Sequence, residues 1–140
     1  MIKDYFISLS DFKEFVNELN NNSLGRNIVI NGIDDFDLDQ SFDLAIFSIN
    51  DLQIDQENFS DFTKKIRKKI YSLSNGGWNL KILDLGIFNK GNQHSDSQFA
   101  INEILNQLSI LKVKVLVINL GNNLLCLLYT SPSPRDLSTS

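Results

Sequence analysis

The chain has 140 residues, of which 42% are hydrophobic, so it is long enough for one domain with a buried core. Its formal net charge of −4 gives no general attraction to nucleic acid or to an anionic membrane, and we expect neither as a partner. One cysteine rules out an internal disulfide framework, and no apolar stretch forms a signal-peptide core or approaches the roughly 20 residues that span a bilayer, so we expect a cytoplasmic protein.

The first predicted element is a helix over residues 11–19, because apolar residues recur there at the spacing of one helix face. Asp11 and Glu14 are a plausible cap pair at its start. A short strand is predicted at residues 27–30, and an acidic loop follows at residues 34–43.

Three apolar runs alternate with two amphipathic helices in the remainder of the chain. The runs have strand length and are almost continuously apolar, as expected for a parallel sheet that is covered on both faces. Alternation of strands and helices is the pattern of a parallel α/β sheet with right-handed crossovers. We therefore predict a three-layer α/β/α fold with a parallel sheet, with strands at 44–49, 80–85 and 113–120 and helices at 61–73 and from residue 95 onward.

Each of these two helices has a predicted start and a predicted buried stripe. Ser60 is the expected N-cap of the first helix, and Ser95 with Gln98 forms a capping box at the start of the second. Gly86 is expected to end the strand at 80–85. The stripes expected to be buried are Phe62, Ile66, Ile70 and Leu73 in the first helix and Ile101, Ile104, Leu105, Leu108 and Leu111 in the second.

Several of these segments follow one another in the order and spacing of a known enzyme family. The segment at 78–86 reads Trp-Asn-Leu-Lys-Ile-Leu-Asp-Leu-Gly, and Asp-Ser-Gln-Phe-Ala at 96–100 opens the next helix. The helix upstream contains Ile-Arg-Lys-Lys-Ile-Tyr at 66–71. These three segments resemble the second-strand signature, the next helix and the Gly-Pro-x-x-Ile-Arg helix of the ureohydrolase family, which includes arginase, agmatinase and formimidoylglutamase. Residues 43–49 and 113–121 resemble the family's first and third strands.

The resemblance covers about residues 43–125 and implies the N-terminal part of an arginase-like domain, with its first three strands side by side in the order two, one, three. Ureohydrolases use two manganese ions to hold a hydroxide that attacks the central carbon of a guanidino or formimino group in a linear amidine. The resemblance implies such a substrate for the parent protein, and a homo-oligomer, since family members are often oligomers. The outer edge of the third strand would be unpaired, so we expect this chain alone to be marginally stable.

The chain departs from the family at the positions that would hold metal. After the third strand the family has a Gly-Gly-x-His turn whose histidine is the first ligand, whereas this chain reads Leu-Gly-Asn-Asn-Leu at 120–124 and places Asn123 there. A neutral amide is a poor ligand for manganese. The family's later Asp-Ala-His-x-Asp and Asp-x-Asp motifs have no counterpart downstream. We therefore expect no catalytic, cofactor-binding or metal-binding residue in this chain and predict that it is inactive.

The end of the chain differs in character from the rest. Residues 126–140 hold both prolines, and after Tyr129 only Leu137 is apolar. The string Leu-Leu-Tyr-Thr-Ser-Pro-Ser-Pro-Arg-Asp resembles translated sequencing adapter of the kind found in assembled environmental reads. We interpret residues 126–140 as a disordered, non-native tail, residues 43–125 as the arginase-like part and residues 1–42 as a helix and acidic loop leading into it. A native Ser/Pro tail is the alternative.

Three other groups of residues could carry chemistry, and each has a simpler interpretation. His94, the sole histidine, lies in a polar loop and is interpreted as solvated. Oxygen ligands for a hard cation could come from Asp34, Asp35, Asp37 and Asp39, but the calcium-loop pattern is missing, so a solvated acidic loop is favoured. A phosphate or an acidic partner could bind the basic face of the helix at 61–73, but we favour a solvated outer face. The residues of this face are Lys64, Lys65, Arg67, Lys68 and Lys69.

A second functional class remains open beside the hydrolase fragment. The chain could be a small non-catalytic α/β binding module or a pseudoenzyme, and Asn123 favours a branch that has lost its metals. A receiver domain would need a phosphoacceptor aspartate at the end of its third strand, where this chain has Asn-Leu-Gly at 119–121. Trp78 is interpreted as a packing residue at the start of a strand.

Overall fold

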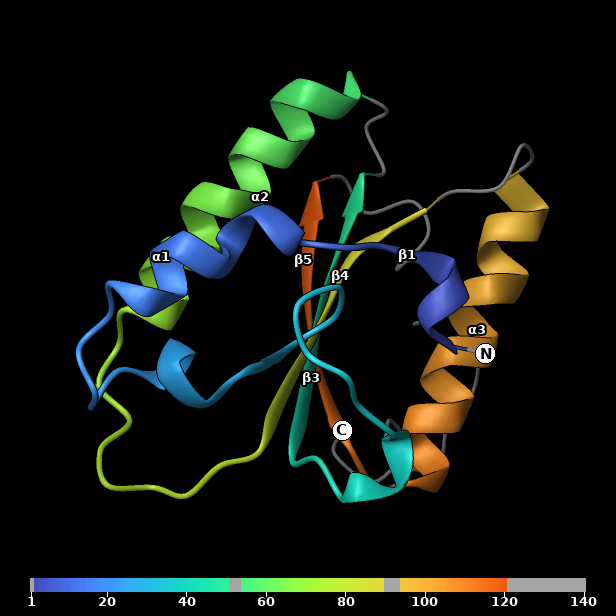
Figure 1. Ribbon diagram of the computed structural model, residues 1–140. Coiled ribbons are helices and arrows are strands. Elements are labelled where there is room, and N and C mark those ends of the chain that lie inside the picture. Colours follow the sequence, from blue (N-terminus) through green and yellow to red (C-terminus); the bar gives the residue numbers. More distant parts are fainter. Residues whose placement is uncertain (1, 51–53, 90–93, 121–140) are drawn as a thin grey trace, which may run out of the picture.

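A computed structural model of the chain describes residues 2–50, 54–89 and 94–120. It is an α/β structure built on a five-stranded, mostly parallel sheet (Figure 1). The strands are β1 (Phe6–Ile7), β2 (Val29–Ile30), β3 (Leu44–Asn50), β4 (Ile82–Phe88) and β5 (Lys114–Leu120). The α-helices are α1 (Lys13–Asn17), α2 (Gln56–Tyr71) and α3 (His94–Ile110), and short 3-10 turns lie at Ile2–Tyr5, Ser10–Phe12, Leu24–Asn27 and Leu38–Gln40.

The three long strands have the predicted arrangement. The sheet runs β1-β4-β3-β5, with β2 also beside β4, so the long strands lie in the order two, one, three. β3 is parallel to both β4 and β5. β1 pairs with β4 in the antiparallel sense, an addition that the sequence pattern did not predict because β1 has only two residues.

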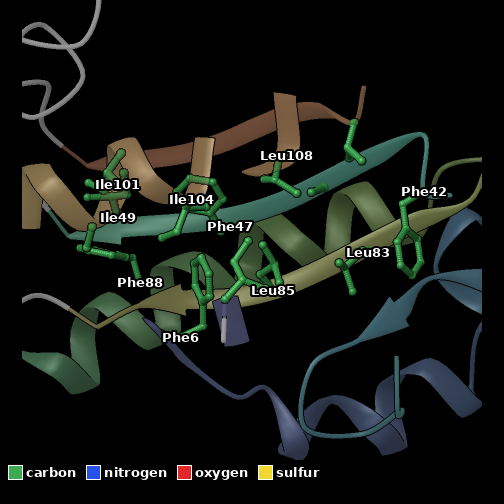
Figure 2. Close-up of a cluster of buried hydrophobic side chains, with 14 residues drawn as sticks. Phe6, Phe42, Phe47, Ile49, Leu83, Leu85, Phe88, Ile101, Ile104 and Leu108 are labelled. Carbon is green, nitrogen blue, oxygen red and sulfur yellow. The ribbon is translucent and has the colours of Figure 1, made fainter. Parts of the chain in front are cut away.

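Helices cover both faces of the sheet, which confirms the three-layer α/β/α fold. α2 and α1 lie on one face and α3 lies on the other (Figure 1). Because side chains alternate along a strand, neighbouring residues of β3 enter different cores, with Phe47 facing α3 and Ile46 facing α2. Figure 2 shows the α3-side core, in which Ile101, Ile104 and Leu108 of α3 contact sheet residues.

Helix α2 begins earlier than predicted and buries a different stripe. Asp55 caps it by accepting a hydrogen bond from the backbone N–H of Asn58 (3.1 Å), so Ser60 lies inside the helix and the predicted cap is wrong. Phe62, Ile66 and Ile70 of the predicted stripe are partly buried and pack against the core, whereas Leu73, which follows the helix, is 56% exposed. The fully buried stripe is Phe59, Thr63, Arg67 and Tyr71. A hydrophobicity pattern could not find this stripe, because half of it is polar.

Two other helix predictions need correction at their ends. α3 already includes Ser95, so this residue does not cap the helix, whereas Ile101, Ile104 and Leu108 are buried as predicted. The first helix is split into Ser10–Phe12 and α1 and receives no side-chain cap. Asp11 lies in the Ser10–Phe12 turn and instead forms an ion pair with Lys64 of α2.

Strand β4 starts and ends later than predicted. It runs through Gly86 to Phe88, and Trp78 precedes it with 73% of its surface exposed, so the interpretation of Trp78 as a packing residue is wrong. The pairing of β3 with β4 changes register at Leu85, because Ile46 pairs with Asp84 and the next residue of β3, Phe47, pairs with Gly86. This β-bulge lets the strand continue past a glycine that would otherwise signal its end.

The outer edge of β5 is a site where the chain is expected to self-associate. Within the described residues, β5 pairs only with β3, and Leu116 on this strand is 40% exposed. An unpaired apolar edge strand can form hydrogen bonds with a strand of another chain, and a lysine on the edge strand opposes such pairing. We expect Leu116→Lys to lower the light scattering of concentrated solutions, whereas Phe99→Lys, on the outer surface of α3, leaves it unchanged. Equal scattering from wild type and Leu116→Lys would contradict this expectation.

In the described part of the chain, no helix is both long enough and apolar enough to cross a membrane. Asn123 and the segment 126–140 lie outside the described residues, so the interpretations given for them above stay predictions.

Candidate functional site

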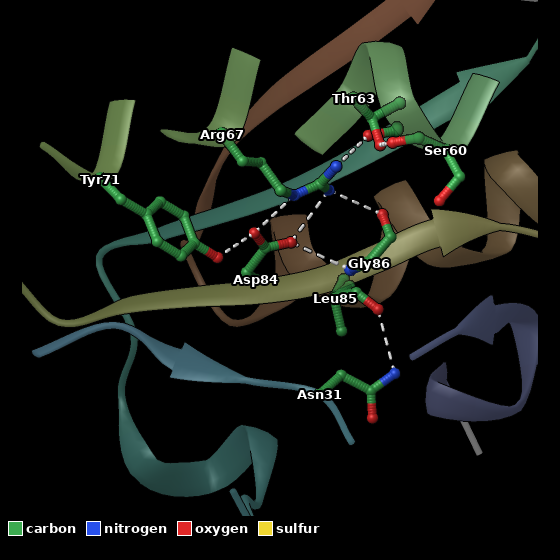
Figure 3. A network of polar contacts seen from close by, with 9 residues as sticks. Asn31, Ser60, Thr63, Arg67, Tyr71, Asp84, Leu85 and Gly86 are labelled. Carbon is green, nitrogen blue, oxygen red and sulfur yellow. Dashed lines mark hydrogen bonds and ion pairs between the residues drawn. The ribbon is translucent and has the colours of Figure 1, made fainter. Parts of the chain in front are cut away.

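The most unusual local feature of the structure is a charged pair at the centre of the domain. Arg67 of α2 and Asp84 of β4 both have fully buried side chains. The Nε atom of Arg67 donates to Oδ2 of Asp84 at 2.7 Å, and one terminal nitrogen donates to Oδ1 at 3.0 Å (Figure 3). Such a two-point contact between guanidinium and carboxylate fixes both distance and orientation.

Further hydrogen bonds occupy the remaining polar atoms around this pair. A second terminal nitrogen of Arg67 donates to Oγ of Ser48 on β3 at 2.6 Å, and the carbonyl of Gly86 accepts from Arg67 at 2.9 Å. The backbone N–H of Gly86 donates to Oδ1 of Asp84 at 3.0 Å, and the hydroxyl of Tyr71 donates to its Oδ2. One helix is thereby joined to both central strands.

The local sequence explains why these groups meet. Arg67 and Tyr71 are four residues apart, so they lie on the same face of α2 and both side chains reach the sheet. The bulge at Leu85 turns the N–H and the carbonyl of Gly86 toward this helix, where a regular strand would use them in the ladder. On the other edge of β4, the Asn31 side chain donates to the Leu85 carbonyl at 3.0 Å (Figure 3).

The network shifts one titration strongly. Burial, reinforced by the negative charge of Asp84, raises the pKa of the Tyr71 phenol far above its ordinary value of 10.0. Tyr71 therefore stays protonated, and it can act as a hydrogen-bond donor to the carboxylate at every pH at which the protein is handled.

Tyr71 should make the fold sensitive to alkali. Above pH 10 the unfolded chain releases this proton and the folded chain keeps it, so the stability contributed by Tyr71 falls as pH rises, by about 1.4 kcal/mol per pH unit. Urea unfolding between pH 8 and about pH 11 tests this. Tyr71→Phe is expected to lose about 1.5–3 kcal/mol at neutral pH with the hydrogen bond, and to flatten the alkaline decline relative to wild type. Parallel declines in the two proteins would contradict the assignment.

The arrangement is suited to holding the fold rather than to chemistry. Arg67, Tyr71, Ser48 and Asp84 are each 0% exposed, so a substrate has no path to them in this conformation. The carboxylate of Asp84 already accepts hydrogen bonds from Arg67, Tyr71 and Gly86, so both of its oxygens are occupied by groups of the protein itself. We therefore describe the network as the element that aligns α2 with β3 and β4.

Sequence reasoning missed this network by treating Arg67 as part of a solvated basic face. Arg67 is fully buried, and this correction separates it from Lys65, Lys68 and Lys69, which are exposed. A usable signal was present in the four-residue spacing of Arg67 and Tyr71 opposite an aspartate within an apolar strand. A buried aspartate needs a cation or several donors, so Asp84 itself predicts a partner.

The acidic loop serves local backbone structure. Asp37 caps the turn at Leu38–Gln40, with its side chain accepting from the N–H of Asp39. Asp34 accepts from the N–H of Ile30 at 3.0 Å. Among the described residues, no three His, Cys, Asp or Glu side chains come together as metal ligands would. The side chain of His94 lies outside the described set.

Comparison with known proteins adds no relative. No protein-family model matches the chain, and neither a search of the curated proteins nor a search of the solved structures finds a match.

Proposed function

We propose that this chain supplies the N-terminal strands of an arginase-like α/β hydrolase whose parent protein cleaves guanidino or formimino C–N bonds in linear amidines. In this proposal the chain itself is a scaffold without activity. One contact carries the proposal: Arg67 and Asp84, which belong to two separate segments that resemble the ureohydrolases, form a single buried pair.

The contact between Arg67 and Asp84 supports the resemblance because it joins two segments that each resemble the family. The Ile-Arg pair at 66–67 resembles a helix of the family, and the Asp-Leu-Gly run at 84–86 resembles one of its strands. A guanidinium that bonds to the carboxylate of Asp84 and to the carbonyl of Gly86 uses both segments at once. The strand order β4-β3-β5 agrees with the order that the resemblance implies.

The manganese pair of the family does not fit the described residues, because they bring no set of carboxylates and imidazoles together. Hard divalent ions need several such ligands. In the proposed parent, the ligands come from residues that follow β5.

A non-catalytic binding module or pseudoenzyme is the second candidate. Asn123 favours it, because this amide stands where the family has its first metal ligand.

Sequencing the source gene past the codon for Leu125 tests the proposal. A reading frame that continues into Asp-Ala-His-x-Asp and Asp-x-Asp motifs supports a manganese hydrolase. A frame that continues without these motifs favours the binding module. Independent reads that end in Ser-Pro-Ser-Pro-Arg-Asp-Leu-Ser-Thr-Ser would overturn the proposal.

A biochemical test is available in parallel. The purified chain with added Mn²⁺ should release neither urea nor formamide from arginine, agmatine or formimidoylglutamate. Release by this chain would contradict the scaffold role.

A further inference from the structure

The dipeptide Asn-Gly occurs twice in this chain, at residues 31–32 and 75–76. Asparagine is thermolabile in proteins, and most of all before glycine, which has no side chain to shield its backbone nitrogen. That nitrogen can attack the side-chain amide of the asparagine that precedes it. The surroundings of each pair decide whether the attack takes place, and the two pairs of this chain have opposite surroundings.

Asn31 is held in place by the interior of the domain. It is 8% exposed, and its side-chain nitrogen donates to the carbonyl of Leu85 in β4 at 3.0 Å. Its backbone N–H donates to the carbonyl of Asp84 at 2.9 Å. Gly32 lies against Ser8, which occupies the space that a Cβ atom would take. Turning the Asn31 amide toward the nitrogen of Gly32 would break a buried hydrogen bond, and the folded chain resists this.

Asn75 lies instead in a surface turn of the loop between α2 and β4, which swings outward in yellow-green at the lower left of Figure 1. The N–H of Trp78 donates to the carbonyl of Asn75 at 3.0 Å and closes this turn. Its two central residues, Gly76 and Gly77, are exposed and have φ angles of +63° and +78°. Both angles favour glycine, so the turn itself requires an unshielded residue after Asn75.

The side chain of Asn75 is already turned toward this backbone. Its Oδ1 accepts a hydrogen bond from the N–H of Gly77 at 3.0 Å, a geometry that holds Cγ beside the intervening peptide bond. The same hydrogen bond draws electron density away from Cγ and makes it a better electrophile. The N–H of Gly76 donates to the exposed hydroxyl of Ser74 at 3.2 Å, so solvent reaches the attacking nitrogen.

We propose that Asn75 is a modification site, which converts without an enzyme to aspartate and isoaspartate in the folded protein, whereas the fold protects Asn31. The Gly76 nitrogen gives its proton to hydroxide and attacks Cγ of Asn75. The new N–Cγ bond forms, the bond from Cγ to the side-chain nitrogen breaks, and ammonia leaves with a proton taken from water. One water molecule then opens the resulting five-membered succinimide at either carbonyl, and no oxidant or reductant takes part.

Opening of the ring to isoaspartate reroutes the main chain through the side chain of residue 75. The carbonyl that accepted from the N–H of Trp78 then belongs to a carboxylate outside the main chain, so the turn has to rearrange. Either product adds one negative charge to a chain whose net charge is −4. The backbone N–H of Asn75 also donates to the carbonyl of Asn22 at 2.8 Å, so the change falls where this loop is tied to an earlier segment. None of this depends on the proposed hydrolase relationship.

Tryptic peptide mapping by mass spectrometry follows both sites in one sample, because residues 27–64 and 70–81 fall in different peptides. The purified chain is kept in warm, mildly alkaline buffer and sampled over several weeks. We expect Asn75 to be lost with first-order kinetics, giving two products of equal mass, aspartate and isoaspartate. Conversion at Asn31 should be at least about tenfold slower, because its amide must first leave the Leu85 carbonyl. In urea, where the fold no longer protects Asn31, the two sites should react at similar rates.

Variants of the turn identify the attacking nitrogen. Gly76→Ala places a methyl group beside this nitrogen and should slow conversion at Asn75 by about tenfold or more. Gly77→Ala is its matched control, because its Cβ would meet no atom within 4 Å and leaves the nitrogen of Gly76 unshielded. It should convert within about threefold of the wild-type rate. Asn75→Gln, whose longer side chain would need a six-membered ring, should stay unmodified, and circular dichroism confirms that each variant is folded.

Trp78 is the only tryptophan of the chain, so its fluorescence gives a second readout of the same event. Its emission should shift as wild type converts and stay constant in Asn75→Gln. Three results would overturn the proposal. These are conversion of Asn75 in urea without conversion in the folded chain, equal rates at Asn75 and Asn31 in the folded chain, and an unchanged rate in Gly76→Ala with aspartate as the sole product.

Discussion

Replacing Arg67 with methionine is expected to destabilise the fold by about 3–5 kcal/mol, because the change leaves the carboxylate of Asp84 buried without its cation. The substitution removes the two contacts with Asp84 and those with Ser48 and Gly86. Small domains are stable by about 5–15 kcal/mol in total, so the loss would be a large fraction of the free energy of unfolding. Urea unfolding followed by circular dichroism measures the change.

Two further variants separate the charge from the loss of packing. Lys65→Met makes the same replacement of a cation by methionine at an exposed position of α2 and should alter stability by no more than about 0.5 kcal/mol. Adding Asp84→Asn to Arg67→Met should restore part of the loss, because the neutral amide no longer needs a cation. An Arg67→Met protein that unfolds at the wild-type midpoint would show that the buried pair contributes nothing.

The periodic parts of this fold could be predicted from the sequence. Apolar runs such as the one at 44–49 predict buried parallel strands because both faces of the sheet are covered, and the structure confirms this for β3 and β4. The run at 113–120 also forms a strand, β5, but its edge position leaves Leu116 40% exposed. The stripe of Ile101, Ile104 and Leu108 predicted the helix α3, because these residues recur at helical spacing and are buried. Hydrophobic periodicity reports burial directly, so it succeeds where the buried side chains are apolar.

The candidate site could not be predicted in this way, because its buried residues are polar. A pattern that equates charge with exposure places Arg67 in solvent, and only the pairing with Asp84 explains its burial. Trp78 shows the opposite failure, since a large aromatic before a strand predicts packing, whereas the turn at Asn75 directs it outward. The misassignment of Arg67 concerns a residue that has a role, since it lies at the centre of the buried network.

Gly86→Ala is the second change expected to have a large effect. Gly86 has φ of +101°, a conformation that side-chain-bearing residues rarely adopt, and a Cβ atom there would lie against the carbonyl oxygen of Ile7 in β1. Strained backbone and overpacking cost about 1–3 kcal/mol each, so we expect a loss of about 2–6 kcal/mol in urea unfolding. Part of that loss should come from the network, because Gly86 bonds to both Arg67 and Asp84.

Gly77→Ala provides the matched control, because Gly77 also has a positive φ angle but has no neighbouring atoms that a Cβ would contact. Gly77 has φ of +78°, and no atom lies within 4 Å of the position its Cβ would take. Only the cost of the strained backbone remains there, about 1–3 kcal/mol. The difference between the two variants therefore measures what the close approach of β1 and the bulge require of Gly86. Equal losses of stability in the two variants would mean that β4 and β1 can move apart. They would also mean that the bulge in β4 does not fix the position of Asp84 relative to Arg67.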